Sequence, residues 1–148
     1  MTKTVKIIGG GLAGSEAAYY LAKKGYKVKL YDIKPNAYTP AHKNPNYGEL
    51  VCSNSLKSND IYGNACGLLK EEMRILGSMV IEVADGCSVP AGAALAVDRD
   101  KFAQNITDKL RSMENIEFIT ENVEKIDVSE NVIIATDRKS TRLNSSHR

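Results

Sequence analysis

A glycine-rich segment near the start of the chain has the spacing that holds the pyrophosphate of a dinucleotide. Gly9, Gly11 and Gly14 follow the pattern GxGxxG. The first glycine of that pattern permits a tight turn, the second lets the backbone approach the pyrophosphate, and the third lets a helix pack closely on a strand. The phosphates then lie at the positive end of the following helix. The expected ligand contacts are the consecutive residues Gly9, Gly10, Gly11, Leu12, Ala13 and Gly14.

A carboxylate follows at the separation that ribose recognition requires. Asp32 lies eighteen residues after Gly14, close to the roughly 20 residues typical of the acid that binds the ribose hydroxyls. An acid there also disfavours the additional phosphate of NADP. A tight turn without a ligand is the alternative, but the coincidence of strand, glycines, helix and acid favours a nucleotide site. The motif alone leaves NAD and FAD open, and the long irregular insert after the second strand is more typical of flavoproteins.

Three cysteines, Cys52, Cys66 and Cys87, supply thiols that could act as nucleophiles or metal ligands. They form no CxxC pair and are odd in number, which favours free thiols in a reducing compartment over disulfides or a metal site. A single loop cysteine is more often structural than catalytic. From the residues alone, Cys66 and Cys87 are expected to pack in the interior, and Cys52 has no assigned role.

The elements that position these groups alternate between strand and helix patterns along the chain. This alternation predicts an α/β fold with a parallel sheet and flanking helices, as in a Rossmann-like nucleotide-binding domain. The pattern predicts a buried strand at residues 5–8, a helix from Leu12 to Gly25 and a second strand ending at Asp32. Asp98 is expected to cap a helix whose buried face is formed by Phe102, Ile106, Leu110 and Met113. The remaining expectations are a loop at 33–62, a helix at 67–84, a short apolar run at 93–97 and strands at 116–120, 123–128 and 132–135.

The composition limits the class of protein. The 148 residues suffice for one domain with a core but are few for the two or three domains that a dinucleotide-dependent enzyme usually needs. No apolar run reaches the roughly 18 residues of a membrane span and no signal peptide is evident, so we expect a cytoplasmic protein without a membrane partner. The net charge of +2 comes from the last twelve residues, and without them 16 basic groups face 17 acidic ones. Composition therefore gives no support for a nucleic-acid partner.

The last twelve residues, 137–148, have no periodicity and only Leu143 as a strongly apolar residue. Residues 137–147 look like the in-frame translation of a common sequencing-library adapter. We therefore expect residues 1–136 to be the N-terminal part of a nucleotide-binding domain that is incomplete at its C-terminus, and 137–148 to be a non-native tail.

Six stretches of the chain together resemble one family closely. They read GGGLAGSEAA at 9–18, TPAH at 39–42, ELVCSNSL at 49–56, GLLKEEMR at 67–74, VPAG at 89–92 and ALAVDRD at 94–100. The chain resembles the FAD- and folate-dependent tRNA (uracil-5-)-methyltransferases, from Val5 to about Thr136, which is roughly the first third of that family's length. The stretch at 9–18 is shared by many flavoproteins, whereas those around Cys52 and Asp98 are specific. Asp32 stands where the family more often has Glu.

The resemblance implies a function and a set of partners. FAD would be the cofactor, methylenetetrahydrofolate the methyl donor, NAD(P)H the reductant, and uracil C5 of a T-loop uridine in tRNA the acceptor. Cys52 falls on a cysteine that the family places in the active site, as nucleophile or as an assisting thiol. Val123 matches a position whose backbone holds adenine in related flavoproteins, with an ordinary core valine as the alternative. The 148-residue chain by itself is expected to be inactive, and its oligomeric state is not predicted.

Three other functions are compatible with parts of this pattern. The sister family that modifies the wobble uridine of tRNA also uses FAD and folate, but it carries His where this chain has Leu12 and lacks the Cys52 stretch. A plain NAD-dependent oxidoreductase and a nucleotide-binding module without catalysis are the others. The glycine motif alone fits all three.

Overall fold

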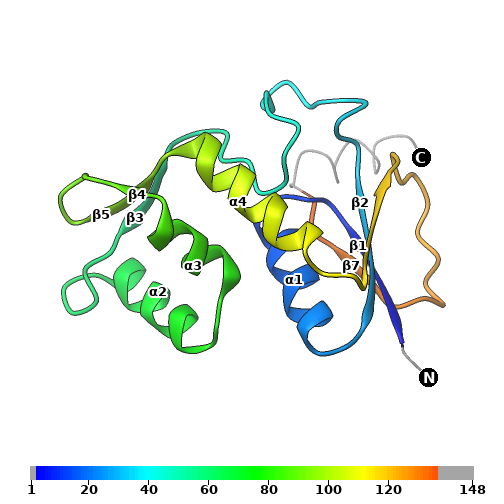
Figure 1. Ribbon diagram of the computed structural model, residues 1–148, viewed down its shortest axis with the longest axis horizontal. Coiled ribbons are helices and arrows are strands. Elements are labelled where there is room, and N and C mark those ends of the chain that lie inside the picture. The colour runs from blue at the N-terminus through cyan, green and yellow to red at the C-terminus, as the bar shows by residue number, and fades with distance from the viewer. Residues whose placement is uncertain (1–2, 137–148) are drawn as a thin grey trace.

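The computed structural model describes residues 3–136, and the tail predicted at 137–148 lies outside the described residues. Figure 1 shows a sheet with helices on one side and a smaller sheet at the far end of the molecule. The helices are α1 (Leu12–Lys23), α2 (Ala65–Ile75), α3 (Met79–Gly86) and α4 (Arg99–Arg111). The strands are β1 (Thr4–Ile8), β2 (Lys27–Asp32), β3 (Ser55–Ser58), β4 (Ser88–Val89), β5 (Ala94–Val97), β6 (Ile116–Thr120) and β7 (Val132–Ile134).

The larger sheet is parallel and places the nucleotide motif at its carboxyl edge. Its strand order is β6-β2-β1-β7, with Ile8 paired to Tyr31 on one side and to Ile134 on the other. The glycine turn leaves β1 and Asp32 ends β2 at this same edge. The parallel sheet with its flanking helices confirms the predicted fold class. In open α/β sheets ligands bind outside the carboxyl ends of the strands, so a ligand site is expected at this edge.

The core lies between this sheet and the helices α1 and α4. Ile7, Val28 and Leu30 of the sheet are fully buried. Each such side chain contributes about 1.5–3 kcal/mol relative to an exposed one. The α4 residues Phe102, Ile106 and Leu110 are also fully buried and Met113 packs against the same core. The spacing of four and four residues therefore predicted the buried face of α4 correctly, whereas Met113 lies beyond the end of the helix and is half-buried.

A second, antiparallel sheet was not predicted. Its strand order is β3-β5-β4, and β3 lies inside the segment at 33–62 that the sequence suggested was a loop. The pairing of Ser55 with Ala96 and of Ser58 with Ala94 is irregular between these points, where Lys57 adopts a positive φ of 67°. This four-residue strand has Leu56 as its single apolar residue and so shows no apolar alternation, and its pairing arises from contact with β5.

The single helix predicted at 67–84 is wrong, because the chain forms the two helices α2 and α3 there. Gly77 has a φ of +79°, which ends α2 in the way that glycine commonly ends helices. The hydroxyl of Ser78 then accepts a hydrogen bond from the Ile81 amide and caps α3. The helical spacing of the apolar residues continues across Gly77 and hid this break.

The strand predicted at 123–128 is also wrong. This segment joins β6 to β7 as an irregular connection, with Val128 94% exposed. Asp127 Oδ1 accepts a hydrogen bond from the Ser129 amide at 2.9 Å, a local turn that competes with sheet pairing. The alternation of valine and isoleucine has no apolar surface to cover here.

The cap of α4 gives a first testable prediction. Asp98 Oδ1 accepts hydrogen bonds from the amides of Asp100 and Lys101 at 3.2 and 3.1 Å. We expect Asp98→Ala to lower the free energy of unfolding by about 1 kcal/mol, the usual cost of losing such a cap, as measured by urea denaturation. Asp98→Asn keeps the acceptor and should retain most of the stability. Asp100→Ala serves as the control, and an equal loss in that variant would contradict the capping role of Asp98.

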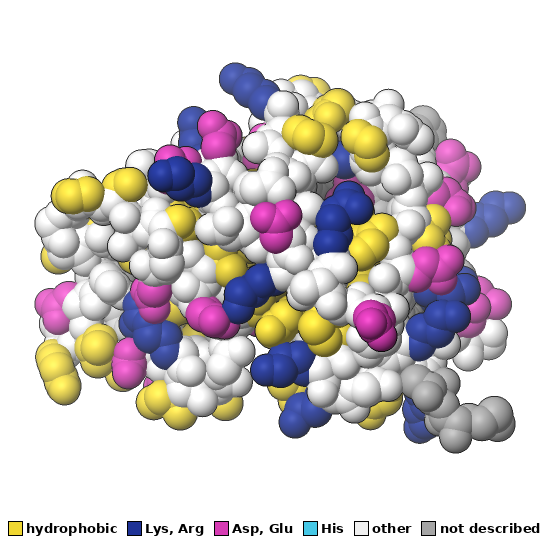
Figure 2. Space-filling view, in the orientation of Figure 1, with side chains coloured by type: hydrophobic (Ala, Val, Ile, Leu, Met, Phe, Trp, Pro, Cys, Tyr) yellow, Lys and Arg dark blue, Asp and Glu magenta, His cyan; other side chains and the backbone are white. Residues whose placement is uncertain are grey.

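One face of the molecule is mixed in charge. On the face shown in Figure 2, Lys and Arg side chains alternate with Asp and Glu and form no continuous area of one sign. None of the helices in the described part of the chain is long and apolar enough to cross a membrane.

Candidate functional site

The glycine turn after β1 is shaped by two close approaches of the backbone. Gly9 has a φ of +107°, a conformation that L side chains rarely adopt, and a Cβ there would lie 2.8 Å from the Ala135 carbonyl oxygen. A Cβ on Gly14 would lie 1.8 Å from the Gly9 carbonyl oxygen. Both positions therefore require glycine for the fold itself, whether or not a ligand is bound.

Gly11 differs, because a Cβ there would meet no atom within 4 Å. Gly11 is the N-cap of α1, and no side chain in residues 3–136 donates or accepts a capping hydrogen bond at this helix end. Leu12 is half-buried and Ala13 is exposed. An uncapped helix N-terminus with open space beside it leaves backbone amides free to bind an anion.

Asp32 braces the same turn. Its Oδ2 accepts a hydrogen bond from the Gly10 amide at 2.7 Å and its Oδ1 accepts one from the Lys34 amide at 2.8 Å. An ionised carboxylate has about four lone-pair sites, so two remain for further donors such as ribose hydroxyls. The sequence predicted the place of this acid but not its two backbone contacts.

The long insert after β2 returns to the glycine turn. The Gly48 amide donates to the Gly10 carbonyl at 2.8 Å, and the buried Tyr47 ring lies so close to Gly10 that a Cβ there would be 2.3 Å from it. Burial raises the pKa of the Tyr47 phenol and the nearby Asp32 carboxylate raises it further. Gly10 is therefore fixed by contact with the insert, a requirement that the spacing of the glycines does not reveal.

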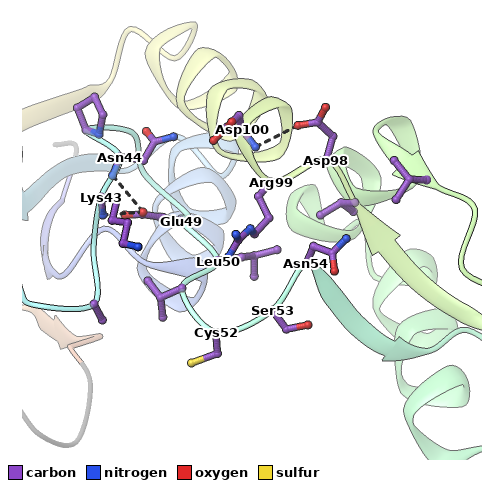
Figure 3. Close-up of a pocket in the computed structure, with 15 residues that line it drawn as sticks. Lys43, Asn44, Glu49, Leu50, Cys52, Ser53, Asn54, Asp98, Arg99 and Asp100 are labelled. Carbon is purple, nitrogen blue, oxygen red and sulfur yellow. Dashed lines mark hydrogen bonds between the residues drawn. The ribbon is translucent and has the colours of Figure 1, made fainter.

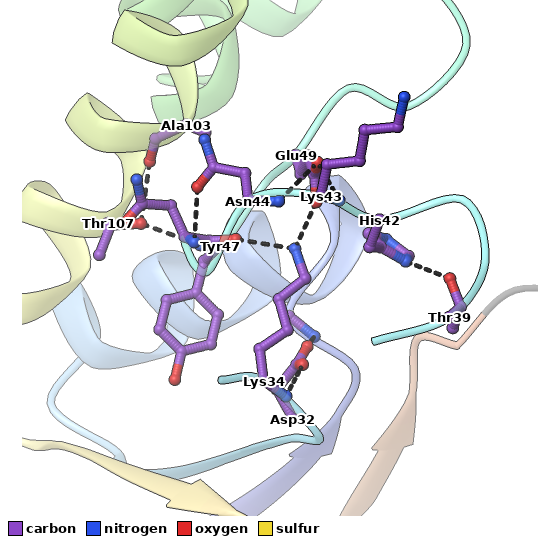
Figure 4. Close-up of polar contacts among 12 residues, drawn as sticks. Asp32, Lys34, Thr39, His42, Lys43, Asn44, Tyr47, Glu49, Ala103 and Thr107 are labelled. Carbon is purple, nitrogen blue, oxygen red and sulfur yellow. Dashed lines mark hydrogen bonds and ion pairs between the residues drawn. The ribbon is translucent and has the colours of Figure 1, made fainter. Parts of the chain in front are cut away.

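A buried ion pair closes the insert on itself, as Figure 4 shows. Lys34 Nζ donates to Glu49 Oε2 at 2.7 Å and to the Asn46 carbonyl at 3.0 Å, and the two charged side chains are only 7% and 11% exposed. Glu49 Oε1 accepts from the amides of Lys43 and Asn44. Burial alone would raise the pKa of Glu49, but the hydrogen bonds from Lys34 and the Lys43 amide outweigh it and hold this pKa below its ordinary value.

Cys52 lies on a cavity that the insert lines together with the end of β5 and the start of α4. The cavity has a volume of about 910 Å³, within the range of small-molecule sites, and Figure 3 shows it between the insert and the start of α4. The Cys52 side chain is exposed. Cys52 lies four positions after Gly48, which is at most about 14 Å of extended chain. The insert that contacts the glycine turn through Gly48 therefore also lines the cavity of Cys52.

The other predicted residues lie apart from this cavity. Cys87 is buried and its thiol donates to the Val83 carbonyl, so its predicted packing role is confirmed. Cys66 is half-buried and lines a separate apolar cavity between α1, α2 and α3. Val123 is half-buried beyond the end of β6, two residues after Glu121, whose amide donates to the Asp32 carbonyl at 2.9 Å. It therefore lies near the edge that carries Asp32.

Comparison with known proteins places this arrangement in a family. The profile of the family described as glucose inhibited division protein A matches residues 4–146. The chain belongs to the glucose inhibited division protein A family.

Curated relatives of this member of the glucose inhibited division protein A family carry a more specific name. It is 58% identical over 131 residues to the protein named methylenetetrahydrofolate--tRNA-(uracil-5-)-methyltransferase TrmFO from Acholeplasma laidlawii, covering 88% of the chain and 30% of the relative. It is 49% identical over 148 residues to the protein of the same name from Bacillus licheniformis, covering all of the chain and 34% of the relative. The chain thus spans about a third of the length of these relatives.

A solved structure shares the fold. The crystal structure of CtdE in complex with FAD and substrate 4 matches with a TM-score of 0.50 and 15% sequence identity, over 84% of this chain and 31% of that one. At this identity the likeness concerns the fold of the family member and agrees with the parallel α/β architecture.

Proposed function

We propose that this chain is the FAD-binding part of an enzyme that methylates uracil C5 of a T-loop uridine in tRNA. Methylenetetrahydrofolate would donate the carbon and NAD(P)H would be the reductant. The observation that carries the proposal is the identity of 58% to a relative named for this reaction, in a chain whose exposed Cys52 lies on a cavity lined by the insert that contacts the glycine turn.

The residues of the turn fit a dinucleotide. Gly9 to Gly14 would hold the pyrophosphate, since the open space at Gly11 and the uncapped start of α1 suit an anion. Asp32 would accept hydrogen bonds from the ribose with the lone pairs that its backbone contacts leave available. Val123 would lie against the adenine. Reduced flavin, when bound, supplies the two electrons that turn a methylene group into a methyl group.

Cys52 would serve at the uracil ring. C5 of uracil is a weak nucleophile. Addition of a thiolate to C6 forms a C–S bond and moves the C5–C6 electron pair into an enolate, so that C5 can take the one-carbon unit. Loss of the C5 proton lets the carrier nitrogen leave from the one-carbon unit. A hydride that reduced flavin would supply to this carbon then makes the methyl group, as the C5–C6 double bond re-forms and the thiolate is expelled. The Cys52 thiol is assigned either this addition or assistance to a second cysteine that performs it.

A chimera tests the proposal, because the chain spans about 30% of the length of its relative. Residues 1–136 replace the corresponding segment of the Acholeplasma laidlawii protein, and methyl transfer from methylenetetrahydrofolate to a tRNA transcript is measured with FAD and NAD(P)H present. We expect T-loop methylation, and none on a transcript whose T-loop uridine is cytidine.

Cys52→Ala in the same chimera is expected to lower kcat at least roughly a thousandfold, since removal of a residue that acts covalently costs several orders of magnitude. Cys66→Ala, which removes a thiol distant from the cavity, is the matched control and should retain kcat. A Cys52→Ala chimera as active as the parent would contradict the role of Cys52, and an inactive but folded parent chimera would contradict the proposed function.

A further inference from the structure

The Cys52 cavity carries two cations on opposite walls. Lys43 belongs to the insert and Arg99 is the first residue of α4, and both line the cavity and are exposed. In Figure 3 the Arg99 side chain extends from α4 toward the segment that carries Leu50 and Cys52. The cavity therefore combines a thiol with positive charge delivered from two separate elements.

The acids around the cavity leave these cations available. Glu49 is occupied by Lys34 and by two backbone amides. Asp98 caps α4 through two amides and lies 3.9 Å from Lys101 Nζ. Asp100, the third acid of the lining, lies in the first turn of α4, where the helix dipole favours it. Within residues 3–136 no acid forms an ion pair with Lys43 or Arg99.

The position of Arg99 is unfavourable for stability. A cation in the first turn of a helix opposes the helix dipole, typically by about 0.3–1 kcal/mol. Residues that break a local rule without a compensating contact are expected at functional sites. A guanidinium offers a planar fork of donors that matches a phosphate in a bidentate manner. The arrangement therefore suits an anion that enters with the ligand of Cys52.

We propose that Arg99, with Lys43 opposite, anchors the phosphate of the nucleotide whose base reaches Cys52. This inference rests on the proposed function and names the residue that holds the RNA backbone at the reacting uridine. The uracil base is neutral and makes no ion pair with Arg99. The contact of Arg99 with the phosphate would instead fix the position of the base relative to the Cys52 thiol. The pyrophosphate of FAD is the other phosphate group that Arg99 could bind, and the experiment below distinguishes it from the phosphate of the RNA.

Alkylation of Cys52 by iodoacetamide tests the anchor in the 148-residue chain. A Cys66→Ser background is used, since Cys87 is buried, and the rate is measured with uridine monophosphate or uridine as protecting probe. We expect uridine monophosphate to protect Cys52 at a roughly tenfold lower concentration than uridine does. A charge-assisted hydrogen bond contributes about 1.5–3 kcal/mol, and the lower end of this range corresponds to a roughly tenfold change in affinity. Arg99→Met should remove this difference and Arg99→Lys should keep part of it. Lys101→Met, on the same helix outside the cavity lining, should behave as the parent.

The outcomes distinguish the alternatives. Equal protection by uridine monophosphate in the parent and in Arg99→Met would overturn the anchor. Weakened FAD binding by Arg99→Met with unchanged protection by the monophosphate would assign the residue to the cofactor and also overturn it. In the chimera, a raised KM for tRNA with Arg99→Met is expected. A parent chimera without methyl transfer would refute the proposed function, while the protection assay would still decide the phosphate contact.

Discussion

Replacing Gly11 with alanine is expected to lower the affinity of the chain for FAD roughly a hundredfold while hardly changing its stability. The φ of Gly11 is −75°, which alanine adopts freely, and the added methyl group meets no protein atom within 4 Å. The methyl group would instead occupy the space through which the phosphates approach the backbone. Loss of one or two charge-assisted hydrogen bonds of about 1.5–3 kcal/mol each gives this magnitude. Titration calorimetry with FAD measures the affinity.

Gly14→Ala is the matched comparison, because it should act on the fold. Its Cβ would lie 1.8 Å from the Gly9 carbonyl oxygen, so α1 must move away from the end of β1. We expect a loss of at least about 1–3 kcal/mol in the free energy of unfolding, the usual range for overpacking, against less than about 1 kcal/mol for Gly11→Ala. If Gly11→Ala bound FAD like the parent, the open space beside Gly11 would not be the phosphate site.

Lys34→Met is expected to cost about 3–5 kcal/mol of unfolding free energy, because it leaves the buried Glu49 carboxylate without its cation. The two backbone amides that still reach Glu49 favour the lower end of this range. The double variant Lys34→Met/Glu49→Leu should regain most of the loss, since it removes the charge as well. Urea denaturation at neutral pH measures all three proteins.

The pH dependence gives the same ion pair an independent test. The pKa of Glu49 is held below 4.5 in the folded chain. Its contribution to stability is therefore fully present above this value and is lost as the pH falls through the lower folded pKa. In Lys34→Met the acid-induced loss should be smaller. Lys109→Met breaks the partly exposed Lys109–Glu82 pair and should cost less than about 1 kcal/mol. A similarly small effect of Lys34→Met would contradict the role of the buried pair.

The parts of the fold that were predictable depend on local spacing. The glycine turn, the acid that ends β2 and the buried face of α4 follow from steric and periodic rules that a single segment obeys. Asp98 was recognisable as a cap because its side chain acts on the amides directly after it. In each case the residues that were predicted recur at a fixed spacing along the chain.

The parts that were missed depend on contacts between distant segments. Lys34 and Glu49 are fifteen residues apart within an irregular insert, and nothing in their types predicts that they meet. The strand at Ser55–Ser58 forms only because β5 lies beside it. The segment at 123–128 has a strand-like pattern but no partner in the sheet. The sequence showed that Arg99 belongs to a motif. It did not show that the side chain points into the Cys52 cavity, because this depends on where the insert lies.

Competitive titration of the chain with FAD and NAD⁺ tests the central claim most directly, since the glycine turn by itself fits both. The FAD site proposed at Gly9–Gly14 and Asp32 predicts saturable binding of FAD at one site, weakened by Gly11→Ala and not displaced by NAD⁺. Binding of NAD⁺ without binding of FAD would contradict the claim and would favour a nicotinamide-dependent oxidoreductase.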